Sequence, residues 1–302
     1  MSAPGDVTAT QLSLDTQQPA AQVPGLARRG LLRATLRQGK GRLGAALVLL
    51  IVAVAVLGPL VAPDSATLSS AAPYLPPSAG HLLGTDDVGR DVLSRVLDGG
   101  YVILALAAIA TAAAIVVGAL LGCLAASASR AGDEAVMRPL DVLMSFPLIV
   151  LGMLFLSVLG DHLWLIAFTV ALGHLPHVAR TSRAAALSVK DREFVQYASA
   201  LGESRLRLIF GELLPNILGV VLVEFGIRLG YSIGVVAALG FIGFGPPPPA
   251  PDWGGMISEN LEGLLGQPWA VVAPMACVAL LALGVNFLTD AIGKAVSGAA
   301  GG

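Results

Sequence analysis

The chain has 302 residues, of which 55% are hydrophobic and only 13% are charged. Soluble domains carry about 25% charged residues, so this composition excludes a disordered chain and an ordinary soluble enzyme. The formal net charge of −2 gives no basic excess of the kind that binds nucleic acid. Cys123 and Cys277 both lie inside apolar runs, so we read neither a disulfide framework nor a zinc site from them.

The N-terminal segment is polar, unlike the apolar remainder of the chain. Residues 1–27 are rich in Ala, Pro and Gln, lack the early apolar core of a secretory signal, and are predicted to be a disordered cytoplasmic tail. In residues 28–42, Arg29, Arg33 and Arg37 recur every four positions with leucines beside them. This spacing is typical of a basic helix lying in the lipid headgroup region, and the alternative is a disordered basic tail.

Six apolar runs come next, each near the roughly 20 residues that a membrane-spanning helix needs. Helices are the expected form, because an open sheet edge finds no hydrogen-bond partners in lipid. The chain is therefore predicted to be an all-α polytopic membrane protein with a six-span domain over residues 43–296 and a short tail over 297–302. The predicted spans are 43–62, 100–126, 140–159, 163–179, 217–242 and 269–292.

The distribution of Lys and Arg predicts the orientation of the spans. Most of these residues lie before the first span, between the second and third spans, or between the fourth and fifth spans. Because positively charged loops stay in the cytoplasm, both termini and the 180–215 loop are predicted to be cytoplasmic. The 63–99 and 243–268 segments are then predicted to face outward.

Patterns that could carry catalytic chemistry are weak. Gly39-Lys40-Gly41 lacks the upstream glycine and the hydroxyl residue of a phosphate-binding loop. The G-x-S-x-G string over 230–234 lies inside an apolar helix rather than at a strand-to-helix turn, so a chance match is the better interpretation. His174 and His177 have no Cys or carboxylate close by in sequence. We therefore predict no catalytic residue, no metal ligand and no cofactor bound by this chain.

Two opposite charges lie inside the fifth predicted span. Glu224 and Arg228 are four residues apart, and each would cost about 2.5–3.5 kcal/mol at the centre of a lipid-facing helix. A row of glycines from Gly226 to Gly234 falls on roughly the opposite face, which is smooth enough for close helix contact. The pair is either a buried structural ion pair or, with Tyr231, part of a substrate path.

The 180–215 loop is the most specific feature of the sequence. Two short amphipathic helices are predicted there, with a stop at Gly202, a restart at Glu203-Ser204 and an end at Pro215. A compact cytoplasmic knob in a chain without its own motor favours docking onto another protein, and the alternative is a hairpin resting on lipid. The apolar stripes consist of Phe194, Val195, Ala198 and Leu201, and of Leu206, Ile209, Phe210 and Leu213.

At this loop the sequence resembles the inner-membrane permeases of ATP-binding-cassette (ABC) importers. Their EAA signature is Glu-Ala-Ala, three residues, Gly, and a spacer ending in Leu-Pro. Ala198, Gly202 and Pro215 fit this signature, whereas Gln196 and Tyr197 depart from it. The resemblance implies coupling to an ATPase through Gln196, Tyr197, Ala198, Ala200, Leu201, Gly202, Ser204, Leu206, Ile209, Phe210, Leu213 and Pro215.

Further segments narrow the resemblance to the C-type subunit of the dipeptide, oligopeptide and nickel branch. Residues 81–95, HLLGTDDVGRDVLSR, are similar to that branch's LGTDxxGRDVLSR stretch. Residues 240–256 resemble its LSFLGLG…PPxPEWGxM segment, and residues 286–290 resemble the start of its NLLGDxLRDxLDP segment. The resemblance covers roughly residues 30–296.

The resemblance implies a type I ABC importer permease fold in which spans two to five line half of a path for di- or oligopeptides. It also implies a bacterial inner-membrane complex with a homologous B-type permease, two ABC ATPase subunits that use ATP and Mg, and an extracytoplasmic substrate-binding protein. Closure of the ATPases would act on the 180–215 loop and switch the permeases between inward-open and outward-open states.

The outward segments gain a role from the same resemblance. A mixed-charge surface is expected after a helix cap at Thr85, the Pro246–Pro249 run is expected to be extended, and Trp253 and Trp269 suit the outer membrane interface. These segments either receive the binding protein or merely cap the helices. The candidate docking residues are Asp86, Asp87, Arg90, Asp91, Asp252 and Trp253.

Two other functional classes stay open at this point. A self-contained, ion-coupled secondary transporter would have inverted repeats and an ion site near the membrane midplane, and no convincing repeat is visible. An intramembrane hydrolase would use Ser232 as its nucleophile, with His174 as the base on a neighbouring span.

Overall fold

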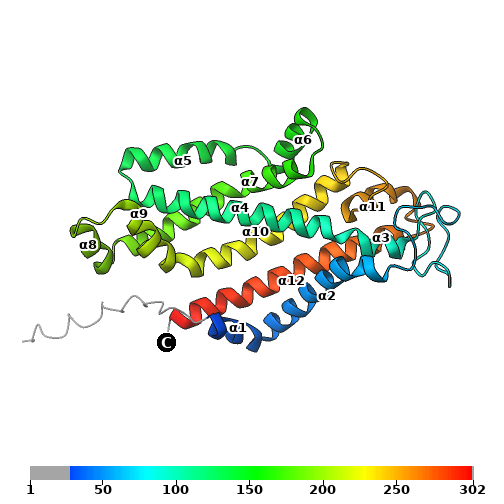
Figure 1. Ribbon diagram of the computed structural model, residues 1–302, viewed down its shortest axis with the longest axis horizontal. Coiled ribbons are helices and arrows are strands. Elements are labelled where there is room, and N and C mark those ends of the chain that lie inside the picture. The colour runs from blue at the N-terminus through cyan, green and yellow to red at the C-terminus, as the bar shows by residue number, and fades with distance from the viewer. Residues whose placement is uncertain (1–27, 301–302) are drawn as a thin grey trace, which may run out of the picture.

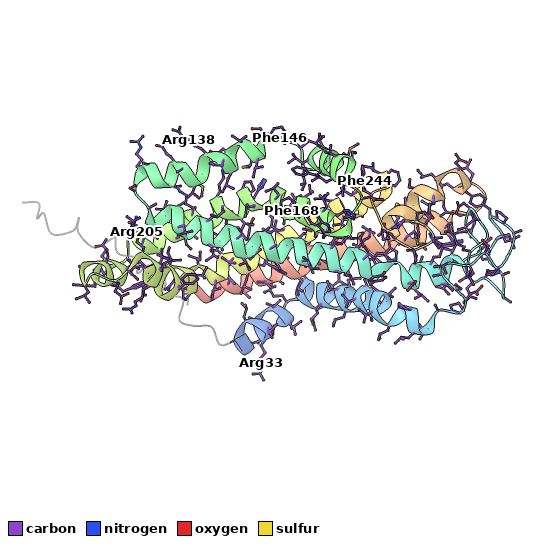
Figure 2. The ribbon with its side chains drawn as sticks, turned by 45° about the horizontal axis from the view of Figure 1, so that its top comes forward. Arg33, Arg138, Phe146, Phe168, Arg205 and Phe244 are labelled. Atoms are coloured by element: carbon purple, nitrogen blue, oxygen red, sulfur yellow. The ribbon has the colours of Figure 1, made fainter. Side chains whose placement is uncertain are left out.

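The computed structural model describes residues 28–300, so the tail predicted over 1–27 lies outside the described residues. The described part is helical apart from turns, loops and one isolated bridge between Thr85 and Asp91. Long helices run side by side, and short helices and loops close the two ends of the bundle (Figure 1). Arg138 and Arg205 lie toward one end, and Phe244 lies toward the other (Figure 2).

The elements are joined by short connections, except for the loop before α3. In chain order they are α1 (Arg28–Arg37), α2 (Gly39–Val61), α3 (Val92–Asp98), α4 (Gly100–Ser127), α5 (Arg130–Met144), α6 (Leu148–Leu159), α7 (Leu163–Lys190), α8 (Glu193–Ala200), α9 (Arg205–Arg207), the π-helix η1 (Leu208–Leu213), α10 (Leu214–Ile242), α11 (Trp253–Glu259), the 3-10 helix η2 (Leu261–Gly263) and α12 (Trp269–Ala300).

Five of the described helices are long and apolar enough to cross a membrane, namely α2, α4, α7, α10 and α12. They correspond to all the predicted spans except the third. That span, 140–159, is wrong as a single helix, because α5 and α6 meet there at an angle of 85°. Pro147 lies in the break, directly before α6, and explains it. Proline has no N–H to donate, and it disfavours the helical conformation at Phe146. The α5–α6 pair is a sixth span only as a broken one.

Several predicted boundaries are also wrong. The basic helix predicted over 28–42 ends at Arg37, and α2 begins two residues later. The tail predicted over 297–302 is helical as far as Ala300, and α7 continues to Lys190 rather than ending at 179. Hydropathy ends a span where charges begin, but a helix continues into water as long as its backbone hydrogen bonds continue.

Small residues bring the long helices close together. In α4, a side chain on Gly118 would collide with Val178 of α7, and one on Gly122 would collide with backbone atoms of α7. A side chain on Gly44 of α2 would collide with the backbone of α12. Such contacts are how membrane helices associate when lipid provides no hydrophobic driving force between them.

The short segments are grouped at the ends of the bundle as the sequence predicts. The segment α8–α9, the helix α1 and the last turns of α12 lie at one end (Figure 1). The helices α3 and α11 and the loops beside them lie at the other end (Figure 1). Ion pairs from Asp141 to Arg180 and from Asp133 to Arg183 hold α5 against α7.

Candidate functional site

A knob formed by residues 193–213 projects from one end of the bundle, and a glycine turn divides it. Gly202 comes after α8 with a φ of +82°, in the left-handed region that residues with side chains rarely adopt. Its N–H donates to Ser199 O at 3.0 Å, and the N–H of Glu203 donates to Ala198 O at 3.2 Å. These bonds satisfy carbonyls at the end of α8, so the stop expected at Gly202 is present.

The second half of the knob is not a separate helix, contrary to the prediction. Ser204 caps α9, which passes through η1 directly into α10. In η1 the N–H of Leu214 donates to Ile209 O, five residues back. Pro215 directly follows η1 at the start of α10, and the helical segment continues across it, so it does not end the helix. Residues 205–242 therefore form one continuous rod.

The apolar side chains of the knob are divided between the protein core and the outside. Val195, Ile209 and Leu213 are buried and pack in a cluster with residues of α4, α7 and α10. The predicted stripes are therefore only half internal. Exposed large apolar side chains of the knob are Phe194, Tyr197, Leu201, Leu206 and Phe210. Leu201 is 85% exposed. Several exposed apolar side chains gathered in one segment make it a candidate interaction surface.

The remaining predicted coupling residues also lie on the outside of the knob. Gln196, Ala200, Gly202 and Ser204 are exposed, whereas Ala198 is half-buried. The amide of Gln196 donates to Asp191 O within the chain at 3.2 Å. The exposed positions surround the turn, so the surface is continuous across it.

The charged pair in α10 is formed as the spacing predicts. Arg228 Nε donates to Glu224 Oε1 at 2.7 Å, and the two side chains are 15% and 8% exposed. The guanidinium carbon of Arg228 lies 5.5 Å from the centre of the Tyr231 ring, which is a cation–π distance. Tyr231 itself is 62% exposed.

The glycine face of α10 packs against α12 over part of its length. A side chain on Gly226 would collide with Thr289, and one on Gly230 would approach Asn286. The expected close contact is therefore present at these two positions. It is absent at Gly234, where no atom of a neighbouring element among the described residues lies within 4 Å of the position that a Cβ would take. Each step of four residues advances about 40° around a helix, so the glycine row turns away from α12.

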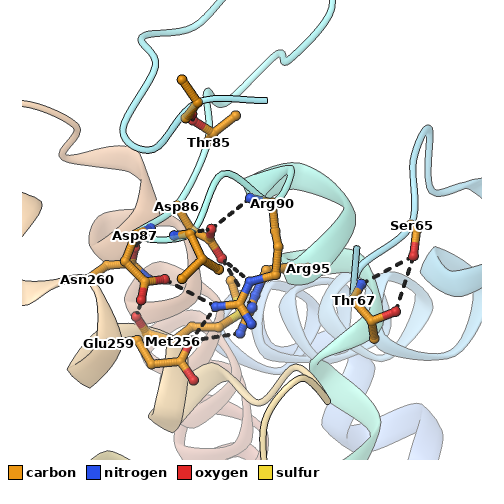
Figure 3. Close-up of polar contacts among 12 residues, drawn as sticks. Ser65, Thr67, Thr85, Asp86, Asp87, Arg90, Arg95, Met256, Glu259 and Asn260 are labelled. Atoms are coloured by element: carbon orange, nitrogen blue, oxygen red, sulfur yellow. Dashed lines mark hydrogen bonds and ion pairs between the residues drawn. The ribbon is translucent and has the colours of Figure 1, made fainter. Parts of the chain in front are cut away.

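The predicted mixed-charge surface is instead an internal ionic cluster (Figure 3). It lies at the end of the bundle that holds α3 and α11, which we call the outward end after its predicted orientation. Asp86 is fully buried, and its Oδ2 lies 2.6 Å from Arg90 Nε and 3.1 Å from Arg95 Nη1. Both arginines also reach Glu259 Oε2, at 3.1 Å and 2.8 Å. Asp87 remains partly accessible, with its side chain 27% exposed. A carboxylate or guanidinium that is removed from water needs partners of opposite charge, which explains why each of these buried charges is paired.

Asp91, and not Thr85, caps the helix α3. Its Oδ2 accepts from Ser94 N at 2.8 Å, and its Oδ1 lies 3.0 Å from His81 Nδ1. Thr85 is buried and donates its hydroxyl to Ala72 O instead. The cap lies six residues beyond the predicted position because the intervening residues form a tight turn around the buried Asp86 side chain.

Trp253 does not lie at a membrane interface, contrary to the prediction. It is completely buried, and its Nε1 donates to Val96 O at 2.8 Å. Asp252 caps α11 by accepting from Gly255 N, and burial raises its pKa to about 6. Trp269 is 45% exposed, as an interfacial residue can be. The Pro246–Pro249 run is not fully extended, because Ala250 N–H donates to Pro247 O and closes a turn.

The sequence did not identify Glu259, Asn260 and Arg95 as parts of this end. Asn260 accepts from Asp87 N at 3.0 Å. Carboxylate oxygens of Asp86, Asp87 and Glu259 lie within 4.8 Å of one another, and the two arginines supply positive charge to them. Arg95 was visible in the GRDVLSR stretch, but nothing in the sequence paired it with a residue 164 positions away.

Within residues 28–300, the side chain that pairs with Ser232 is a hydroxyl and not the base that a hydrolase needs. Its hydroxyl lies 2.8 Å from the hydroxyl of Thr111, and both residues are completely buried between α4 and α10. The pair satisfies two polar groups inside an apolar bundle.

A family model described as "Binding-protein-dependent transport system inner membrane component" matches residues 114–298, which include the knob, α10 and nearly all of α12. The chain belongs to this family. It is therefore a multi-pass inner-membrane permease of an ABC importer and the non-catalytic membrane subunit of that system. Family membership implies ATPase subunits and a binding protein as its partners. It also decides against the secondary-transporter and hydrolase alternatives.

Curated relatives agree with the expected branch. The chain is 35% identical over 259 residues to the "Probable D,D-dipeptide transport system permease protein DdpC" of Escherichia coli (strain K12), covering 85% of this chain and 87% of the relative. It is 32% identical over 254 residues to the "Dipeptide transport system permease protein DppC" of Alkalihalophilus pseudofirmus, covering 84% of each. The resemblance to C-type permeases is thus confirmed.

A solved structure confirms the fold. A chain of the MetNI methionine ABC transporter in an inward-facing conformation superposes with a TM-score of 0.56 at 20% identity. The match covers 68% of this permease and 96% of that chain. The all-helical importer permease fold expected from the sequence is therefore the fold observed.

Proposed function

We propose that this permease is the C-type subunit of an ATP-driven importer for di- and oligopeptides and that it pairs with a homologous B-type permease. The relatives at 35% and 32% identity are named for dipeptide transport, and each match spans more than four fifths of both chains. Two permeases enclose a path that neither encloses alone. Spans two to five of this chain, from α4 to α10, line one half of it.

The observation that carries the coupling proposal is the position of the knob. Its five exposed apolar side chains lie at the start of a helical rod that continues to the Glu224–Arg228 pair. A cleft of an ATPase subunit covers this surface, and closure of the ATPases moves the rod. Because residues 205–242 form one uninterrupted helical segment, motion of the knob displaces the path-lining part of α10.

The charge distribution supports an orientation for the protein. Lys and Arg concentrate near the knob end and near α1, so this end and both termini face the cytoplasm. The helices α3 and α11 then face outward, where the binding protein docks. Most of the expected docking residues act there by holding the shape of the surface, because Asp86, Arg90, Asp91, Asp252 and Trp253 are buried. Asp87 is accessible enough to contact the binding protein directly.

The test is reconstitution of the complete importer in proteoliposomes. The permease is combined with the proposed B-type partner, ATPases and binding protein, and uptake of a labelled dipeptide is measured with and without ATP. We expect uptake only when all components and ATP are present. Peptide uptake by the permease alone under a proton or sodium gradient would overturn the proposal, as would an intact, ATP-hydrolysing complex that takes up no peptide.

A further inference from the structure

Four polar side chains lie on α7 and α10, two helices that pack against each other in the bundle. Two of them are the partners Glu224 and Arg228 of α10. The others are His174 and His177 of α7. Intramembrane ionisable groups are expensive to bury, so such a group of four indicates a functional site rather than a packing accident.

The His174 imidazole has hydrogen-bonding capacity that the described part of the chain does not use. His174 Nε2 is buried and has no hydrogen-bond partner among residues 28–300. His174 as a whole is only 4% exposed. Buried polar atoms of native proteins are nearly always paired, so this nitrogen points to a polar group that arrives from outside the chain.

The accessible charge of the cluster is positive. Glu224 is the more deeply buried member of the pair, and one of its oxygens already accepts from Arg228 Nε. The Nη1 and Nη2 groups of Arg228 donate to no other side chain or carbonyl of the described chain. They lie beside Tyr231, whose side chain is largely exposed on one face of the bundle that residues 28–300 form. A ligand entering from that face meets guanidinium donors first.

We propose that Arg228, positioned by Glu224 and assisted by His174, binds the C-terminal carboxylate of the peptide during its passage. The two Nη groups of a guanidinium match the two oxygens of a carboxylate, which makes such pairs stronger than neutral hydrogen bonds. Glu224 keeps Arg228 in place and lowers the net charge of the pair, so the carboxylate binds weakly enough to be released. This inference rests on the proposed transport of peptides, and it adds a substrate contact within the permease to whatever selection the binding protein makes.

The test compares a dipeptide that has a free C-terminal carboxylate with its C-terminal amide. The complete importer is reconstituted, each peptide is supplied at a concentration shown to saturate the binding protein, and initial ATP-dependent uptake rates are measured. Loss of a charge-assisted hydrogen bond is worth about 1.5–3 kcal/mol, so the wild type should take up the free peptide roughly 10- to 100-fold faster than the amide. Arg228→Gln should lower the ratio of free-peptide uptake to amide uptake to about one. Arg228→Lys should keep part of the preference, and His174→Ala should weaken it.

Two further variants make the result decisive. The double variant Glu224→Gln/Arg228→Gln leaves no unpaired buried charge, so it removes the preference even if Arg228→Gln alone does not fold. Arg130→Gln is the matched control, because this arginine is 94% exposed on the surface of α5 and should change neither rate. Equal uptake of both peptides by the wild type would overturn the inference, and so would an equal reduction of both rates in the double variant, which is what a purely structural pair predicts. Absence of uptake of either peptide by the wild type would instead overturn the proposed function.

Discussion

Arg95 Nη2 lies 2.8 Å from Glu259 Oε2, and this contact joins α3 to α11 across 164 positions of the sequence. The same guanidinium lies 3.1 Å from the buried Asp86 carboxylate. Arg95 is therefore the central cation of the outward end, and it ties the loop before α3 to the segment between α10 and α12.

Removal of this cation should destabilise the permease. Breaking a buried ion pair leaves an uncompensated charge and typically costs 3–5 kcal/mol, so we expect Arg95→Met to lose about 3 kcal/mol, with Arg90 compensating in part. Thermal unfolding of the detergent-solubilised protein, followed by size-exclusion chromatography after heating, measures the change. Arg130→Met is the control, because its exposed pair with Glu134 should contribute almost nothing. Equal melting temperatures of Arg95→Met and the wild type would contradict the assignment.

The contact between α10 and α12 should be sensitive to a single methyl group. Gly226→Ala would place a Cβ against Thr289, and overpacking of this kind costs about 1–3 kcal/mol. Gly234→Ala, on the same helix, meets open space and should leave stability unchanged or raise it through helix propensity. The difference in melting temperature between the two variants is the measurement. If they melt together, α10 and α12 do not pack through Gly226.

The turn at Gly202 should couple ATP hydrolysis to uptake. No atom of the described chain lies within 4 Å of a Cβ built on Gly202, so Gly202→Trp projects its ring outward, where the ATPase is proposed to lie. We expect peptide binding by the binding protein to stay intact and ATP hydrolysis to continue without uptake.

The φ of +82° at Gly202 requires a second variant. Asn tolerates the left-handed conformation better than other side-chain-bearing residues, so Gly202→Asn separates backbone strain from steric obstruction. Its uptake should exceed that of Gly202→Trp. Normal uptake by Gly202→Trp in reconstituted vesicles would show that the knob is not the point of coupling.

The outward end should gain stability from Asp252 on acidification. Burial raises the pKa of Asp252 to about 6 from an ordinary 3.8, so between these values the folded state binds more protons than the unfolded state. This group therefore stabilises the fold as the pH falls from about 6 to about 4, and its ionisation opposes folding by about 3 kcal/mol above pH 6.

Asp252→Asn tests this assignment, since the amide can still accept a hydrogen bond at the cap of α11 but cannot ionise. Its melting temperature relative to the wild type should be higher at roughly pH 7.5 than at roughly pH 4.5, because these values lie on either side of the raised pKa of Asp252. Other acidic groups that titrate at this end, such as Glu259 and Asp87, are present in both proteins and cancel in the comparison. A difference that is the same at both pH values would show that Asp252 is not the titrating group.

Features that depend on neighbouring residues were predictable from the sequence. Five spans correspond to uninterrupted apolar runs, the Glu224–Arg228 pair results from four-residue spacing on a helix, and the turn is marked by Gly202. The third span was mispredicted because hydropathy averages over Pro147, whose missing donor breaks the helix. Pro215 was misread in the opposite direction, since the helical segment passes through η1 and continues across this proline.

The outward end could not be predicted, because its partners are distant in sequence. Asp86, Arg90 and Asp91 are charged residues in a loop, and charged loop residues are usually exposed. They are buried here because α11 returns to α3 and supplies Glu259, which Arg90 and Arg95 both contact. Trp253 was misplaced for the same reason, since the carbonyl that its indole reaches belongs to Val96.

The sequence by itself determined the membrane class, the family, five spans and the position of the glycine turn, because each of these depends on composition or on contacts between residues a few positions apart. Only the tertiary structure decided which charges are buried, that residues 205–242 form one helical segment, and that α7, which carries the buried His174, packs against α10. These features depend on which distant segments pack together, and burial and ion pairing result from that packing.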